Sequence, residues 1–154
     1  MADYPFTTFN FAVEINVPEI ADLPTYLCDA AFSECDGLEM TMEVKTIREG
    51  GNNGKQIRLT GPTSYGMLTL KRGMTNSFDL WNWFSAMHAS NNLKARANAE
   101  ITVFAADGET EQVRFILERC IPIKLKAPAL NAKDGIVAIE ELQLAYETLT
   151  LQAT

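Results

Sequence analysis

Strict alternation of apolar and polar residues is the feature that most restricts how this chain can fold. In the eight residues from Leu38 to Lys45, every second residue is apolar and those between are polar. This period of two is typical of a half-buried β-strand, because successive side chains leave opposite faces of a strand. A chain with this pattern in its middle is predicted to be built mainly on strands.

The residues after this strand alternate between loop and strand signals. The segment from Arg48 to Ser64 is rich in glycine, asparagine and proline, which predicts a long exposed loop. Met67–Lys71 alternates again and predicts a second short strand that ends at Gly73. If the turn into the next element requires a positive φ at Gly73, Gly73→Val should damage folding.

An amphipathic helix is predicted next, with Asn76 or Ser77 as its cap and Asn91-Asn92 at its end. Four large apolar residues have the spacing i, i+3, i+4 and i+7, which places them on one stripe of a helix. This packing stripe consists of Leu80, Trp83, Phe84 and Met87. The stripe predicts a helix that lies on a sheet.

Further strands are predicted on both sides of this centre. They cover Phe9–Val17, Ala99–Ala105, Glu111–Ile123 and Ile136–Leu151, with a hairpin turn at Asp107-Gly108. Several strands and a single helix predict a mainly β (α+β) fold, an antiparallel β-sandwich or partial barrel with one packed α-helix. We find no repeat and no linker, so residues 1–154 are expected to form one domain.

Composition excludes several classes of protein. The net charge of −7 argues against non-specific nucleic-acid binding, and in a pore it would repel an acidic cargo. No run of about 20 apolar residues predicts a membrane span, and the N-terminus does not resemble a signal peptide. The three cysteines are expected to be reduced, buried thiols of a cytoplasmic protein. The sequence leaves open whether Cys28 and Cys35 form a disulfide.

No catalytic, cofactor or metal site is predicted. The glycine-rich segment lacks the P-loop pattern, because Glu49 and Gln56 stand where a glycine and a hydroxyl residue are needed. The single histidine, His88, has no partners at ligand or triad spacing and is expected on the helix surface. Carboxylates on the polar strand faces are best interpreted as solvated charge, and Trp81 and Trp83 as packing residues. We therefore expect a protein that is not an enzyme.

The central motifs resemble those of the tail tube proteins of contractile phages, a family that also supplies inner tubes to phage-like contractile injection systems. The resemblance runs from about Phe9 to Gln152 and rests on Gly37-Leu38, the Gly61-Pro62 pair and Leu80-Trp81-Asn82-Trp83. Its most specific part begins at Leu68-Thr69-Leu70-Lys71-Arg72-Gly73.

The resemblance implies hexameric rings that stack into a hollow tube, with each subunit contributing strands to one shared β-barrel around a lumen. The lumen-facing candidates are the polar strand residues Glu39, Thr41, Glu43, Lys45, Thr69, Lys71, Glu141, Gln143 and Glu147. The candidates for contact with the neighbouring subunit and ring lie in the glycine-rich loop and are Gly50, Gly51, Asn52, Asn53, Gly54 and Lys55.

The implied function is that of a structural inner-tube subunit. Its expected partners are further copies of itself, a contractile sheath protein, baseplate or spike proteins, and cargo or DNA that passes the lumen without sequence-specific binding. It would assemble in the cytoplasm into a tail-like particle, without a membrane anchor. Two alternatives stay open: a tube-initiator or baseplate adaptor ring, which the long Val17–Cys35 segment would suit, and a monomeric ligand-binding β-barrel.

Overall fold

The computed structural model describes residues 10–17, 26–28, 32–48, 50–51, 54–74, 78–88, 95–133 and 135–153, with the side chains of 26–28 excepted. Several sequence expectations fall outside this part of the chain. They concern the loop residues Asn52 and Asn53 and most of the Val17–Cys35 segment. Asn76, Ser77, Asn91 and Asn92 also lie outside it, but the helix itself is capped at Phe78 and ends at Met87.

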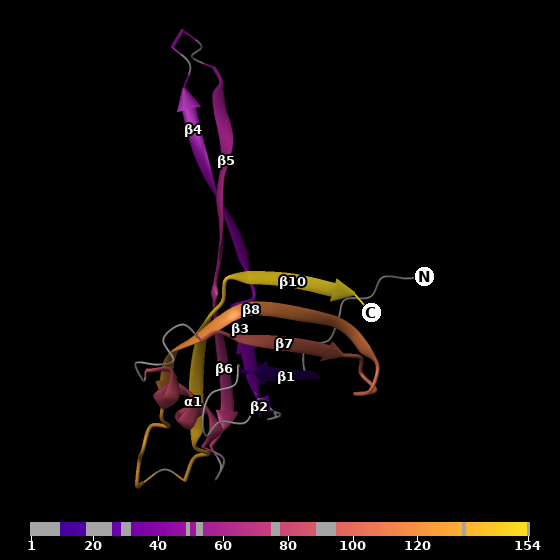
Figure 1. Cartoon of the computed structure of the whole chain (residues 1–154), viewed down its shortest axis with the longest axis vertical. Coiled ribbons are helices and arrows are strands. Elements are labelled where there is room, and N and C mark those ends of the chain that lie inside the picture. The colour runs from indigo at the N-terminus through magenta and orange to yellow at the C-terminus, as the bar shows by residue number, and fades with distance from the viewer. Residues whose placement is uncertain are drawn as a thin grey trace.

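The fold is mainly β and every strand pairing in it is antiparallel, as predicted (Figure 1). One eight-stranded sheet contains, in spatial order, β2 (Tyr26–Cys28), β1 (Phe11–Asn16), β7 (Ala97–Phe104), β8 (Glu111–Lys126), β9 (Ile139–Ala145), β6 (Met67–Gly73) and β3 (Glu34–Asp36), with β10 (Thr148–Ala153) also beside β8. A separate hairpin consists of β4 (Met40–Arg48) and β5 (Gln56–Tyr65). The helix α1 spans Asp79–Met87.

The long strand β8 divides the large sheet into two parts. Its first half pairs with β7 and β10, and its second half, from Ile121 onward, pairs with β9. Between the halves Arg119 has a φ of 56°, and the register with β7 shifts between Ala97 and Ala99. We call β2, β1, β7, β10 and the first half of β8 sheet A, and β3, β6, β9 and the second half of β8 sheet B.

The core lies where the buried faces of sheets A and B meet the helix. In sheet B, alternate residues are buried because they face this core; they are Leu68, Leu70, Leu142 and Leu144. Sheet A contributes buried side chains that include Ile15, Ile101 and Leu117. Of the helix stripe, Leu80, Trp83 and Met87 are buried and Phe84 is half-buried. His88 is exposed at the C-terminal end of the helix and packs edge-on against Phe84, with ring centroids 4.5 Å apart.

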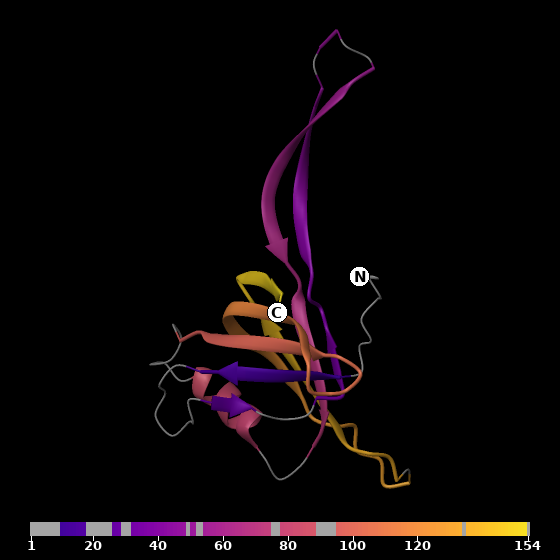
Figure 2. The ribbon, with the colours of Figure 1, turned by 90° about the vertical axis from the view of Figure 1, so that its right-hand side faces the viewer.

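The predicted long loop is wrong, because most of it is strand. β5 covers Gln56–Tyr65, and only residues 49–55 connect it to β4. The Gly61-Pro62 pair does not end the strand but lies at a bulge, where the register with β4 shifts between Met42 and Val44. A side chain at position 61 would place its Cβ 2.6 Å from the carbonyl oxygen of Glu43, so this close approach requires glycine. Figures 1 and 2 show the hairpin extending far from the rest of the subunit.

Three further boundaries differ from the sequence expectation. The predicted final strand is two strands, because the chain breaks its pairing at Tyr146 and Glu147 between β9 and β10. Strand β8 continues past Pro122 to Lys126. The helix is capped at Phe78 without a side-chain hydrogen bond, and Gly73 is not among the glycines with positive φ, which are Gly37, Gly51 and Gly108.

Candidate assembly surfaces

The β4–β5 hairpin exposes large apolar side chains on both of its faces. Near the root, Met40, Met42 and Val44 are 63%, 51% and 53% exposed, so the expectation of a half-buried strand is wrong for the free subunit. Farther out, Ile47, Ile57 and Leu59 are 40–46% exposed. Strand register places this second group on the face opposite the first, because Ile47 pairs with Ile57 and Lys45 with Leu59. We call these six residues the hairpin apolar set.

The root of the hairpin is anchored to sheet B by Tyr146. Its hydroxyl donates to the carbonyl oxygen of Gly37 at 2.7 Å and accepts from the amide nitrogen of Glu39 at 3.2 Å. Its ring lies 5.7 Å from that of Tyr65, the last residue of β5. Burial raises the pKa of Tyr146, which keeps the hydroxyl protonated and able to donate. The hairpin therefore leaves the body from a fixed base.

At the other end of the hairpin, the loop candidates Gly50, Gly51, Gly54 and Lys55 are exposed. Gly51 has a φ of 94°, a backbone conformation that favours glycine. No described contact joins these residues to the body of the subunit.

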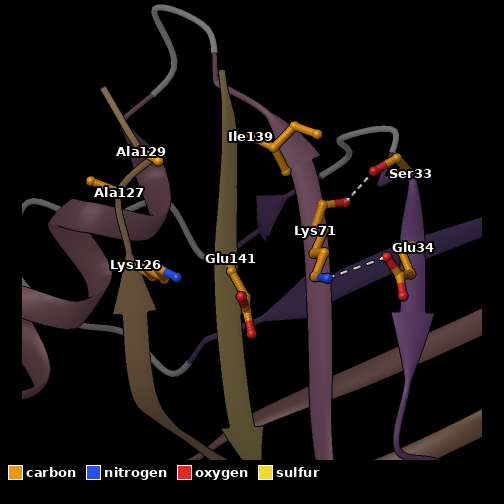
Figure 3. A pocket seen from close by; sticks show the side chains of 8 residues that line it. All are labelled: Ser33, Glu34, Lys71, Lys126, Ala127, Ala129, Ile139 and Glu141. Atoms are coloured by element: carbon orange, nitrogen blue, oxygen red, sulfur yellow. Dashed lines mark hydrogen bonds and ion pairs between the residues drawn. The ribbon is translucent and has the colours of Figure 1, made fainter. Parts of the chain in front are cut away.

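A second surface is the exposed face of sheet B, where charges of alternating sign cross all four strands. Strand register aligns Glu34 with Lys71, Lys71 with Glu141, and Glu141 with Lys126. Figure 3 shows these four side chains next to one another on β3, β6, β9 and β8. The ammonium nitrogen of Lys71 lies 3.5 Å from a carboxylate oxygen of Glu34. We call this row the charged rung.

A parallel row lies two residues further along the same strands. Register aligns Asp36 with Thr69, Thr69 with Gln143, and Gln143 with Lys124. We call it the mixed rung. At the end of this face, a shallow groove of about 330 Å³ is lined by the charged rung together with Ser33, Ala127, Ala129 and Ile139 (Figure 3).

The structure separates the lumen candidates into three places. Thr69, Lys71, Glu141 and Gln143 lie together on the exposed face of sheet B. Thr41, Glu43 and Lys45 lie on the hairpin, and Glu39 lies at its root. Glu147 lies at the break between β9 and β10, where its carboxylate accepts from the Nε of Arg119 at 2.7 Å.

Sequence reasoning missed four members of the exposed face of sheet B: Glu34, Asp36, Lys124 and Lys126. Alternation through Lys124-Leu125-Lys126 could have revealed the two lysines, had the predicted strand been continued past Ile123. Strand β3 spans only three residues, which is too short for an alternating pattern to be recognised in the sequence.

Sites for chemistry are not seen in the described part of the chain. Within the described residues, no group of three or more His, Cys, Asp or Glu side chains could hold a metal ion. The thiols of Cys35 and Cys120 are free, and burial raises the pKa of each to about 12. No helix among the described residues has both the length and the hydropathy needed to cross a bilayer.

Known structures share this fold. A chain in the anti-feeding prophage (AFP) baseplate is 25% identical, with a TM-score of 0.85 over 99% of this chain and 98% of that one. A chain in the extended sheath–tube complex of the extracellular contractile injection system PVC is 18% identical, with a TM-score of 0.80 over 99% and 94% of the two chains. Hcp1 from Flavobacterium johnsoniae is 12% identical, with a TM-score of 0.52 over 93% and 96%. Because the last two chains are less than 25% identical to this one, their similarity shows a shared fold and nothing about function.

Among curated proteins, none matches this chain in sequence. The family model described as T4-like virus tail tube protein gp19 matches residues 7–150, which is nearly the whole chain. The match agrees with the resemblance carried by the central strand and helix motifs. This chain belongs to the T4-like tail tube protein family.

Proposed function

We propose that the chain is the inner-tube subunit of a contractile tail or phage-like injection system, a structural protein without catalytic activity. Six copies form a ring and the rings stack into a hollow tube that a sheath surrounds. The observation that carries this proposal is the hairpin apolar set, which needs a covering partner. Family membership over residues 7–150 supports treating the chain as one tail-tube domain.

The hairpin is the part of the subunit that is expected to be least stable when it is exposed to water. An isolated two-stranded sheet is marginally stable in water, and large apolar side chains exposed together are typical of an interaction site. Because its apolar residues occupy both faces, one flat contact cannot cover them. A hairpin inserted between neighbouring copies, in its own ring or the next, would be covered on both sides.

The large sheet also supports assembly. Its strand order runs from β2 to β3 without these two strands pairing, so the described subunit is an open sheet. A monomeric β-barrel with an enclosed ligand would need a closed one. In the tube, strands of several copies would close one barrel together.

The exposed face of sheet B is the proposed lumen wall. It would present Thr69, Lys71, Glu141 and Gln143 to the cargo, while Thr41, Glu43 and Lys45 would lie with the hairpin in contacts between copies. Cargo would pass without sequence-specific binding. Sheath and baseplate proteins are the proposed partners, because the related chains come from a sheath–tube complex and a baseplate. Assembly would take place in the cytoplasm.

A second role within the same family is a tube initiator that forms the first ring on a baseplate. The similarity to a chain in the AFP baseplate favours it, because that chain is 25% identical and matches over nearly its full length. The two roles differ in one property: a main-tube protein stacks ring on ring, whereas an initiator forms a single ring.

Negative-stain electron microscopy of the purified chain, with light scattering for mass, tests the proposal. Stacked hollow rings are expected for a main-tube subunit and single rings for an initiator. Replacing Met42, Val44 and Leu59 by serine should leave a folded monomer, whereas Thr46→Ser with Thr60→Ser, on the same hairpin, should assemble normally. A wild-type chain that remains monomeric even with baseplate proteins present would overturn the proposal.

A further inference from the structure

We propose that the ring closes when strand β3 of one copy pairs with the second half of β8 of the next copy, in the register that places Glu34 opposite Lys126 and Asp36 opposite Lys124. This inference rests on the proposed tube function and adds to it the pair of strands and the residues that join neighbouring copies.

Both strands have an outer edge available for pairing. In the described part of the chain, β3 pairs with β6 alone. The second half of β8 pairs with β9 on one side, and on its other side β7 reaches no farther than Cys120. The two edges lie at opposite ends of sheet B, so one copy can use both at once. An interface between two different edges is heterologous, and such interfaces generate rings when the rotation between copies closes.

Strand direction suits this junction. The four strands of sheet B are antiparallel in turn, so β8 and β3 run in opposite directions. When the next copy has the same orientation, its β8 is therefore antiparallel to β3 of the first. The antiparallel ladder then continues from copy to copy without a change of pattern.

Charge is complementary at this junction and points to a second copy as the partner. Both rungs end in a carboxylate on β3 and in a lysine on β8, so the joined ends have opposite signs. The same antiparallel register that aligns Glu34 with Lys126 also aligns Asp36 with Lys124. Between these two pairs it places Cys35 opposite Leu125, and both of these half-buried residues pack against the core. One register thus pairs opposite charges on the exposed face of the sheet and apolar side chains on its buried face.

The joined rungs also determine the charge of the proposed lumen wall. They contain three carboxylates, of Glu34, Asp36 and Glu141, and three ammonium groups, of Lys71, Lys124 and Lys126. These rows are therefore neutral although the chain carries a net charge of −7. The wall would not repel an acidic cargo through these rows, in contrast to the expectation from the total charge.

Charge reversal tests the junction. The acid-edge variant combines Glu34→Lys with Asp36→Lys, and the base-edge variant combines Lys124→Glu with Lys126→Glu. Each alone places like charges at every junction, so the concentration needed for ring formation should rise about tenfold or more. A one-to-one mixture restores opposite charges at every junction if the two variants alternate, which a ring of six permits. Mixing, or combining all four changes in one chain, should return ring formation to near the wild-type concentration.

Controls separate this inference from the proposed function. Glu109→Lys with Glu118→Lys makes the same change in net charge as the acid-edge variant, away from both edges, and should assemble like the wild type. Circular dichroism melts of each variant show whether the monomer is folded. If wild type forms rings but either edge variant alone assembles equally well, or the mixture and the combined variant both fail, the junction is wrong and the tube function stands. If wild type forms no rings even with baseplate proteins present, both the junction and the tube function are wrong.

Discussion

Arg72 and Glu140 lie directly opposite each other on β6 and β9 and form an ion pair that is almost completely buried. The Nε of Arg72 lies 2.5 Å from one carboxylate oxygen of Glu140, and the indole nitrogen of Trp81 donates to the other at 2.9 Å. The guanidinium also lies over the ring of Phe32, 5.7 Å from its centroid. This cluster joins sheet B to the helix, because Trp81 belongs to α1.

Glu140→Ala should destabilise the subunit by about 3–5 kcal/mol, because it removes the carboxylate that pairs with the buried Arg72. Urea denaturation followed by circular dichroism measures this loss. Glu141→Ala, one residue further along the same strand but on the half-exposed face, is the matched control and should cost less than about 1 kcal/mol. Equal losses for the two variants would show that the buried pair has no special role.

Gly37→Ala should destabilise the subunit strongly, whereas Gly73→Ala should have little effect. Gly37 has a φ of 104°, and a Cβ there would lie 1.9 Å from the carbonyl oxygen of Met67. A strained backbone conformation alone costs about 1–3 kcal/mol, and the clash with a backbone atom adds to it. At Gly73 the nearest atom to an added Cβ is 3.9 Å away.

Thermal melts of the two alanine variants check this prediction, since each variant replaces one glycine at or directly after the end of a strand of sheet B. A melting temperature for Gly37→Ala equal to that of Gly73→Ala would contradict it.

The sequence predicts the buried face of sheet B well and the hairpin poorly, for one physical reason. Alternation at Leu68 and Leu70 reports burial inside the subunit, and these residues are buried there. Alternation at Met40 and Met42 has the same appearance, yet both are more than half exposed. A pattern shows that a side chain is apolar but not which copy of the chain covers it.

Two other misses come from local chemistry that overrides a simple period. Gly61 and Pro62 are typical turn residues, but the bulge opposite Glu43 accommodates them within a continuous strand. At Tyr146 the alternation continues without a break in the sequence, so nothing marks the point where β9 ends. The break lies beside Glu118 and Arg119 of β8, which are distant in sequence: the amide of Glu147 donates to the carbonyl oxygen of Glu118, and its carboxylate accepts from the Nε of Arg119.

The thiol of Cys120 should resist alkylation in the folded subunit. The side chain is fully buried, and burial raises its pKa to about 12, so at pH 8 only about 1 in 10⁴ molecules carries the reactive thiolate. Iodoacetamide labelling at pH 8, read by mass spectrometry in a Cys28→Ser background, should therefore follow global unfolding for Cys120. Cys35 has a pKa raised to about 12, by burial and then by the charge of Asp36, but it is only half-buried and should react faster. Denaturant should make both react at the same rate, and rapid labelling of native Cys120 would contradict its position in the core.

Acid should remove a stabilising contribution of Asp107 in the β7–β8 turn. Its carboxylate accepts from the amides of Thr110 at 3.0 Å and Glu109 at 2.9 Å and from the Thr110 hydroxyl at 2.7 Å, and these bonds lower its pKa from 3.8 to about 2. Because the folded-state pKa is the lower one, the contribution is present above about pH 4 and is lost as the pH falls through about 2.

The difference in unfolding free energy between wild type and Asp107→Asn, measured from pH 6 to pH 2, should be constant at the upper end of this range and decrease below about pH 4. Asparagine keeps a side-chain oxygen that can accept from the same amides but has no charge to titrate, so the comparison isolates the ionised carboxylate. The decrease should be small because the turn is exposed to solvent, which screens charge. Glu118→Gln, at an exposed position of β8, is the control. If the difference in unfolding free energy between wild type and Asp107→Asn stays constant down to pH 2, the carboxylate charge does not stabilise this turn.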